Sequence, residues 1–361
     1  MKLVLSGYYG FGNVGDEAIL YSVIFALQKH APDIEIYVLS NTPLETAASY
    51  QVKAVNRWSI PEIAKAIKNA DGLISGGGSL FQDQTSLKNV SYYAAIIKFA
   101  HLFKKPVYIY AQGMGPISRN VNKWIIKNAF RASRIISVRD QQSKKLLQDI
   151  GIQQPIRLVP DPVFAISLCD VRDKSADNRA EAKKIAVSVR DWPGDHSYQQ
   201  KLATAFDLLA AKGYQFLFVP MHGAYDYQTS QAIVGSMEHD ASIAPLEHSF
   251  QEKMQLINQS DLLIGMRLHA LIFASLGHTP FVAISYDPKI DSFASIIDHP
   301  VAADIRKDDW DEQNIVGAVE SIFADYAGSV EHMKQKVQPL KDQSEEIAIA
   351  IIKDLSEKMT K

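Results

Sequence analysis

The chain has little cysteine: one residue, Cys169, among 361. A single cysteine excludes an intramolecular disulfide framework and a zinc site built on cysteine ligands. Cys169 follows an apolar run, residues 163–168, so we interpret it as a small buried hydrophobic residue rather than a nucleophile.

The chain also lacks a large excess of charge of either sign and any long apolar run. The formal net charge is −2, so no overall field attracts nucleic acid or anionic lipid, and an anion must bind at a local basic cluster. No apolar run approaches the roughly 18 residues that a membrane-spanning helix needs. The N-terminal MKLVLSGYYG is typical of a first β-strand and lacks the features of a signal peptide. We therefore expect a cytoplasmic protein that binds no nucleic acid and touches a membrane at most peripherally.

Short apolar stretches alternate with amphipathic ones along most of the chain, a pattern that predicts parallel strands covered by helices on both faces. Before residue 170 the expected strands are residues 2–6, 34–39, 72–75, 106–111, 135–138 and 156–159. Later in the chain they are residues 184–189, 215–219, 262–264 and 281–285. The helices expected there include residues 230–237 and, near the C-terminus, 343–359.

A polar, charged stretch over residues 170–184 interrupts this alternation and predicts a linker. Because 361 residues are long for one domain, we predict two domains, residues 1–169 and 185–340. The last helix, within residues 341–361, is expected to pack back on the first domain. The predicted fold class is α/β, with two Rossmann-like doubly wound domains that face each other across a cleft.

The first expected strand ends in a glycine turn, residues 7–15, that matches the dinucleotide pattern G-x-G-x-x-G. Glu35, twenty residues after the turn, would complete that fingerprint. Asp16 and Glu17, however, open the following helix where a pyrophosphate would rest, and two carboxylates repel it. A tight turn with a capping acid is the structural alternative, and a site for a hydroxyl-rich ligand is the functional one.

Glycine turns are also expected after the next central strands, at residues 76–78 and 112–116. Ligands bind beyond the carboxyl ends of the strands in doubly wound sheets. Three such turns on one edge favour a shared pocket over turn geometry alone. Candidate residues for a hydroxyl-rich ligand are Tyr9, Gly12, Asn13, Gly77 and Gly78.

Basic residues follow several other strands. Arg139 and Arg190 each precede an aspartate at a strand end, where an anion site and a surface arginine beside a capping acid are equally good interpretations. His222 ends another strand and is equally well a loop histidine.

Residues 260–270 carry the strongest local signal. A strand ends at Gly265 and a helix begins near His269, so Arg267 and His269 can point at one ligand with the positive end of the helix behind them. This arrangement suits a phosphate or a carboxylate. Lys289 ends the next strand; alone it is typical of a solvated surface lysine, but beside this turn it predicts a further cation for the same anion.

Five motifs occur together in one order: Gly-Asn-x-Gly-Asp at 12–16, Gly-Gly-Gly-Ser at 76–79, Gln-Gly-Met-Gly-Pro at 112–116, Gly-Met-Arg-Leu-His-Ala at 265–270 and Ser-Tyr-Asp-Pro-Lys at 285–289. The set resembles the polysaccharide pyruvyl transferase family over roughly residues 1–300. Within that family it is most similar to bacterial enzymes that pyruvylate a secondary cell-wall polymer for the anchoring of S-layer proteins.

The resemblance implies a glycosyltransferase-like GT-B pair of domains with phosphoenolpyruvate as donor. It also implies a lipid-diphosphate-linked acceptor that contains N-acetylmannosamine, is ketalised at O4 and O6, and would place the protein at the inner face of the cell membrane. Arg267, His269 and Lys289 match the family positions associated with donor binding and catalysis. The donor carries about three negative charges, which favours additional basic residues around it. The candidate donor-binding residues are therefore Arg267, Lys289, Arg139, Arg190 and Gly265.

The roles in catalysis are hypotheses. His269 is the candidate general acid, because an imidazole can hold and release a proton near neutral pH. Asp16 is the candidate acceptor of protons from the sugar hydroxyls, and Lys289 is the third candidate catalytic group. The first domain is then the acceptor side, where Asn13 orients the sugar with Tyr9, Gly12, Gly77 and Gly78, and the second is the phosphoenolpyruvate side. No motif offers a metal cage, and no cofactor is expected.

Other functions fit the same architecture. A GT-B nucleotide-sugar glycosyltransferase, an oxidoreductase that uses the first glycine turn and a non-catalytic sugar-binding module are the alternatives. A lipid-linked acceptor would favour a basic or apolar patch, for which Trp124 among the lysines Lys123 and Lys127 is a candidate, although the pattern is more typical of an amphipathic surface helix.

Overall fold

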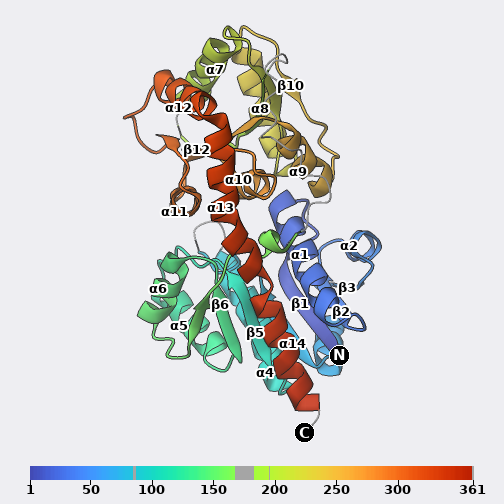
Figure 1. Ribbon diagram of the computed structural model, residues 1–361. Coiled ribbons are helices and arrows are strands. Elements are labelled where there is room, and N and C mark those ends of the chain that lie inside the picture. The colour runs from blue at the N-terminus through green and yellow to red at the C-terminus, as the bar shows by residue number, and fades with distance from the viewer. Residues whose placement is uncertain (84–86, 167–182, 195, 360–361) are drawn as a thin grey trace. The chain divides into compact units, whose positions relative to one another are not determined.

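A computed structural model describes residues 1–83, 87–166, 183–194 and 196–359 (Figure 1). The chain divides into two compact units: Met1–Ile166 together with Leu340–Lys361, and Ser167–Pro339. Cys169 and most of the expected linker, residues 170–182, lie outside the described residues.

Within the described residues, the first unit contains a seven-stranded sheet in the order β3-β2-β1-β4-β5-β6-β7, paired in parallel throughout. The strands are β1 (Lys2–Tyr9), β2 (Glu35–Ser40), β3 (Lys53–Asn56), β4 (Gly72–Gly76), β5 (Val107–Gln112), β6 (Ile135–Val138) and β7 (Ile156–Leu158). The chain winds outward from β1 to β3 and then resumes at β4 on the other side of β1. The carboxyl ends of β1 and β4 therefore form the switch point at which such sheets bind ligands.

Helices connect these strands because each crossover between parallel strands must pass over a sheet face. They are α1 (Val14–His30), α2 (Pro43–Tyr50), α3 (Ile60–Asn69), α4 (Leu87–Leu102), α5 (Asn120–Phe130), α6 (Gln141–Ile150) and the short 3₁₀ helix η1 (Pro162–Ala165). Strands β4 and β5 are buried along their whole length, as expected for central strands with helices on both faces.

The second unit contains a parallel sheet in the order β10-β9-β8-β11-β12-β13. Its strands are β8 (Lys184–Ser188), β9 (Gln215–Phe218), β10 (Ser242–Ile243), β11 (Leu262–Gly265), β12 (Phe281–Ser285) and β13 (Val301–Asp304). Its helices are α7 (Ser197–Ala210), α8 (Gly223–Ser236), α9 (Phe250–Gln259), α10 (Leu268–Leu276), α11 (Pro288–Ile297) and α12 (Glu312–Ala324). Here the switch point lies between β8 and β11.

The last residues of the chain, Leu340–Lys361, belong to the first unit. Helix α13 (Tyr326–Ser344) leads into α14 (Glu346–Met359), which packs against α1 (Figure 1). Asp354 of α14 accepts a hydrogen bond from the Tyr108 hydroxyl at 2.7 Å and pairs with Arg134. Glu345, between the two helices, pairs with Lys29 at the end of α1 at 2.7 Å.

The doubly wound α/β fold expected from the sequence is confirmed for both units, with differences at the edges. The edge strands β3, β10 and β13 were not expected. Helix α8 begins at Gly223, earlier than residue 230. The C-terminal helix expected over residues 343–359 corresponds to α14, and the helix before it, α13, was not expected. Among the described helices, none combines the length and the apolar character that crossing a bilayer requires.

Candidate functional site

At the switch point of the first sheet, three expected site residues lie together with Asp16. The Tyr9 hydroxyl at the end of β1 donates to the Gly76 carbonyl at 2.9 Å. Gly77 and Gly78 follow β4 with left-handed φ angles of +76° and +74°. A Cβ at Gly78 would lie 2.6 Å from the Asp16 carboxylate, so this carboxylate rests directly against the glycine loop.

Two side chains, those of Asn13 and Glu17, hold the glycine turn before α1 in place. Asn13 caps the helix, its side-chain oxygen accepting from the Gly15 amide at 3.1 Å. Glu17 folds back and accepts from the Gly10 amide at 2.9 Å and from the Tyr50 hydroxyl at 2.7 Å. Glu17 therefore holds the turn together, which is the part of the capping acid in the structural alternative. The acceptor roles of Asn13 and Gly12 stay predictions.

Glu35 lies at the wrong end of its strand for dinucleotide binding. It is the first residue of β2, whereas the glycine turn follows the last residue of β1, and the two strands run parallel. Hydrogen bonds from Lys53 and Tyr37 hold the pKa of Glu35 at about 2. A ribose bound at the carboxyl edge could not reach this side chain, which adds a second reason against the dinucleotide interpretation.

Arg139, after β6, is held among acids and hydroxyls of the first unit. Its Nη1 donates to Asp161 and its Nη2 to the Ser79 hydroxyl, at 3.0 and 2.9 Å, and its Nε lies 4.0 Å from Asp140. A Cβ at Gly113 would lie 2.9 Å from Nε, so the missing side chain at Gly113 makes room for the guanidinium. Arg139 thus lies in the first unit, whereas Arg190, Arg267 and Lys289 lie in the second. Its role as a donor ligand stays a prediction.

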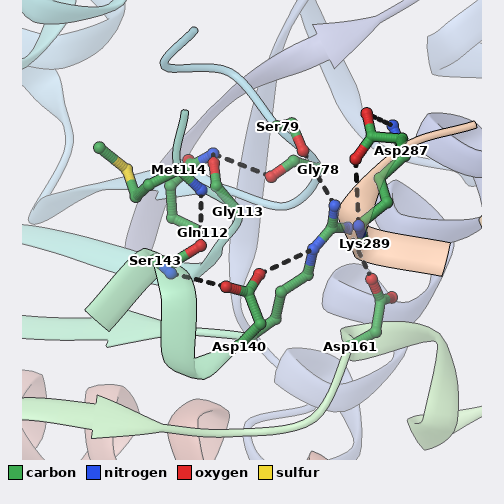
Figure 2. Close-up of polar contacts among 11 residues, drawn as sticks. Gly78, Ser79, Gln112, Gly113, Met114, Asp140, Ser143, Asp161, Asp287 and Lys289 are labelled. Atoms are coloured by element: carbon green, nitrogen blue, oxygen red, sulfur yellow. Dashed lines mark hydrogen bonds and ion pairs between the residues drawn. The ribbon is translucent and has the colours of Figure 1, made fainter. Parts of the chain in front are cut away.

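A hydrogen-bond network fixes the loops around this arginine, as Figure 2 shows for Gly78, Gln112, Gly113, Met114 and Ser143. The Gly78 carbonyl accepts from the Gln112 side chain and the Gly113 amide, each at 2.9 Å. The Ser143 hydroxyl accepts from the Met114 amide at 2.8 Å, and the Ser143 amide donates to Asp140 at 2.6 Å. The loops after β4, β5 and β6 therefore form one rigid edge.

The glycine loop gives a direct prediction. Gly78→Ala is expected to destabilise the protein more than Gly12→Ala. Both residues have left-handed φ angles, which cost a non-glycine residue about 1–2 kcal/mol, but only the Gly78 variant also drives a methyl group into Asp16. A Cβ at Gly12 meets no atom within 4 Å. Chemical denaturation of both variants measures the difference, and equal losses of stability would contradict the contact between Gly78 and Asp16.

Arg57, which the sequence analysis did not identify, supports the first glycine turn from within. It is 4% exposed, and its guanidinium donates to the Gly7 carbonyl at 2.9 Å and to the Tyr93 hydroxyl at 3.2 Å. Four aromatic rings, those of Phe11, Trp58, Tyr92 and Tyr93, lie 4.7–5.6 Å from its guanidinium carbon. No local motif marks Arg57, because its hydrogen-bond partners Gly7 and Tyr93 are distant in the sequence.

In the second unit the expected donor residues Arg190, Arg267 and Lys289, together with His222, follow four neighbouring strands. Arg190 comes after β8, His222 after β9, Arg267 after β11 and Lys289 after β12. Since β9, β8, β11 and β12 are adjacent and parallel, their carboxyl ends lie along one edge. The basic cluster expected from sequence is therefore placed at the switch point of the second sheet.

Arg267 is the N-cap of α10 and is fixed by a buried carboxylate. Its Nε donates to Asp226 Oδ2 at 2.9 Å and its Nη2 to Oδ1 of the same residue. Asp226 is fully buried and also accepts from the Met221 amide at 3.2 Å. The pair is bidentate, so it sets the plane of the guanidinium as well as its position. No sequence motif points to this partner, which lies 41 residues away in α8.

Tyr286 is a further functional candidate, which lies in the Ser-Tyr-Asp-Pro-Lys motif but was not among the expected site residues. Its ring centroid lies 4.4 Å from the Arg190 guanidinium carbon and 5.3 Å from Lys289 Nζ. Burial raises the pKa of Tyr286, but the charges of Lys289, Arg190 and Arg267 and a hydrogen bond with Arg190 outweigh burial and bring it below the usual value. Tyr286 thus reports a strongly positive environment at the end of β12. Its place at a strand end beside Lys289 was the available signal.

The remaining expected residues have mixed outcomes. His269 is the second residue of α10 and is partly exposed, next to Arg267. Gly265 is buried, and a Cβ there would lie 2.7 Å from Leu271, so the structure gives it a packing role between β11 and α10. His222 lies near the cluster: burial, Arg267 and Arg190 lower its pKa, although Asp226 raises it. His222 is therefore neutral at neutral pH.

Lys289 has an ion-pair partner on its own helix. Its Nζ lies 3.2 Å from Asp287, which also caps α11 by accepting from the Lys289 amide at 3.1 Å. Both side chains are about one-third exposed, so the ammonium group remains accessible to an anion. In the part of the chain that the structure describes, no group of three histidine, cysteine or acidic side chains is placed to hold a metal ion.

Comparisons with known proteins agree with this arrangement. The amylovoran biosynthesis protein AmsJ of Erwinia amylovora is 22% identical to the chain, over 98% of the chain and 100% of that protein. The structure of a putative UDP-N-acetylglucosamine 2-epimerase from Listeria monocytogenes is similar with a TM-score of 0.69 and 14% identity, over 99% of this chain and 96% of that one. For the UDP-GlcNAc 2-epimerase from Neisseria meningitidis the TM-score is 0.65 at 14% identity, over 98% and 100% of the two chains.

The two structural similarities establish a shared GT-B-like fold. The assignment to a family rests instead on the family model for polysaccharide pyruvyl transferase, which matches residues 13–288. This match begins at the cap of α1 and ends at the first residue of α11, so it includes the glycine loops after β4 and β5 and the Arg267 turn of the second unit. The chain belongs to the polysaccharide pyruvyl transferase family.

Proposed function

We propose that this pyruvyl transferase takes its pyruvyl group from phosphoenolpyruvate and forms a ketal on a saccharide acceptor, with release of phosphate. The observation that carries the proposal is the cluster of Arg190, Arg267 and Lys289 around Tyr286. Phosphoenolpyruvate presents a phosphate and a carboxylate, and a guanidinium held in place by a buried acid binds such groups with little loss of entropy.

In the proposed reaction, C3 of the enol gains a proton and C2 becomes an electrophile of oxocarbenium character. Two acceptor hydroxyl oxygens bond to C2, and the bond between C2 and the phosphate oxygen breaks. The two hydroxyl protons balance the step: one replaces the proton delivered to C3, and the other leaves with phosphate. His269 is the proposed general acid, and Arg267 and Lys289 stabilise the charge on the departing phosphate.

We assign the acceptor to the first unit, with Asp16 as the base for its hydroxyls and Tyr9, Asn13, Gly77 and Gly78 as binding residues. The contact of Asp16 with the glycine loop after β4 supports this assignment. For the acceptor we propose a lipid-diphosphate-linked saccharide with N-acetylmannosamine, ketalised at O4 and O6, as a precursor of the secondary cell-wall polymer that anchors S-layer proteins. The reaction then takes place in the cytoplasm, at the inner face of the membrane. The sequence motifs support this finer choice, and the amylovoran relative supports a polysaccharide more generally.

The test is release of inorganic phosphate from phosphoenolpyruvate in the presence of a short lipid-linked disaccharide. We expect release that requires both substrates and falls at least about 100-fold in Lys289→Ala. Lys307→Ala, a change of an exposed lysine in the same unit, is the matched control and should retain wild-type release. Transfer from a nucleotide sugar without consumption of phosphoenolpyruvate would overturn the proposal.

A further inference from the structure

One segment of the first unit carries charge of a single sign. Between Asp83 and Asp140 the sequence contains no aspartate or glutamate, and it contains ten lysine and arginine residues. The whole chain has a net charge of −2, so this segment is basic against an acidic background. It includes helices α4 and α5, which pack against each other.

The exposed residues of these helices form two stripes at helical spacing. Among the described side chains, and apart from Asn120 at the start of α5, they are Ser91, Ala95, Lys98 and Leu102 on α4 and Val121, Trp124, Lys127 and Arg131 on α5, the last lying just past the helix end. The two stripes meet, because the Lys98 ammonium lies 5.8 Å from the centroid of the Trp124 ring. We call these eight residues the α4–α5 face.

The α4–α5 face is apolar as well as basic. Leu102, Val121 and Trp124 are 72%, 59% and 61% exposed. Such side chains cost free energy in water, and three on one face are unusual unless another surface covers them. Two other basic residues of the segment form ion pairs within the first unit: Arg134 pairs with Asp354 and Arg139 with Asp161. Lys98, Lys127 and Arg131 have no acidic partner among the described ion pairs, so their charge is available to an anionic partner.

We propose that the α4–α5 face docks the protein on a bilayer that contains anionic phospholipid. Trp124 would insert at the level of the headgroups with Val121 and Leu102, and Lys98, Lys127 and Arg131 would lie over the lipid phosphates. A nucleic acid would use the charge but not the aliphatic side chains. A protein partner of acidic surface would use both, and the test separates it from lipid. The inference deepens the proposed function, because a lipid-linked acceptor must be met at a membrane.

Binding of the full chain to vesicles tests the proposal. We expect sedimentation with vesicles of phosphatidylglycerol and phosphatidylcholine and little with phosphatidylcholine alone. Lys98→Glu/Lys127→Glu should weaken binding at least about 20-fold, since each basic residue near an anionic surface contributes roughly fivefold in affinity. The matched control is Lys353→Glu/Lys358→Glu, the same charge change on α14, which packs against α1 and not on this face. Equal weakening by both pairs would overturn the proposal.

Tryptophan fluorescence gives a second readout. The emission maximum should shift to shorter wavelength on addition of anionic vesicles, and the shift should be lost in Trp124→Ser but kept in Trp58→Ser, whose tryptophan is equally exposed at 62%. A shift that survives Trp124→Ser, or tighter binding to RNA than to vesicles, would overturn the proposal. Phosphate release with a soluble acceptor should be unchanged in the α4–α5 variants, so failure of vesicle binding is distinct from failure of the proposed reaction.

Discussion

Asp226→Ala is expected to lower the free energy of unfolding by about 3–5 kcal/mol, because removing one partner of a buried ion pair leaves the other charge uncompensated. Asp226 is fully buried, and the side chain of its partner Arg267 is 17% exposed. The Met221 amide also loses its acceptor. Urea denaturation measures the loss, and the same variant should lose phosphate release because the Arg267 guanidinium is no longer oriented.

Glu320→Ala is the matched control for this prediction. Glu320 pairs with Lys212 in the same unit, but both side chains are about half exposed, so removal of the acid should cost at most about 1 kcal/mol. A loss of stability in Asp226→Ala no larger than that of Glu320→Ala would show that the Asp226–Arg267 pair does not support the second unit.

His269→Ala is expected to lower the turnover number about 10²- to 10⁴-fold, the usual contribution of a general acid. The affinity for phosphoenolpyruvate should change much less, since Arg267, Lys289 and Arg190 supply the charge that binds the donor. Single-turnover phosphate release and isothermal titration with the donor separate the two quantities.

The control for this loss is His332→Ala. His332 lies on α13 in the same unit and pairs with Asp298, which follows α11. Both side chains are exposed, so removal of the His332 imidazole should leave turnover at the wild-type value. If His269→Ala instead weakened donor affinity and left turnover intact, His269 would be a binding residue and the general acid would have to be another group at the same edge, with Tyr286 as the first candidate.

The central strands could be predicted from the sequence because burial on both faces makes them apolar throughout. Residues 281–285 are an example: the expected strand and β12 coincide, and all five residues are buried. The edge strands could not be predicted in this way. In β3, Lys53–Asn56, all four residues are partly or fully exposed, and β10 has two residues, so neither has an apolar run to detect.

The residues of the candidate site also divide into those that a local sequence motif predicts and those that only the folded structure reveals. Arg267, His269 and Lys289 could be placed at strand ends because local motifs surround them. Asp226 could not, since it lies within α8 and its only link to the site is a side-chain contact across the fold. The bonds of Glu17 to Gly10 and Tyr50 could not be predicted for a related reason, because no spacing in the sequence reveals that this side chain folds back on the turn.

Helix α14 has a consequence for how the protein is made. The strands of the first unit leave the ribosome first, yet Ile347, Ile351 and Leu355, which are buried in that unit, are synthesised last. The intervening residues, Ser167–Pro339, take roughly 10–35 s to translate at about 5–20 residues per second. During that interval the face of α1 that α14 covers stays uncovered. We therefore expect the second unit to complete its folding first, although the first unit begins the chain.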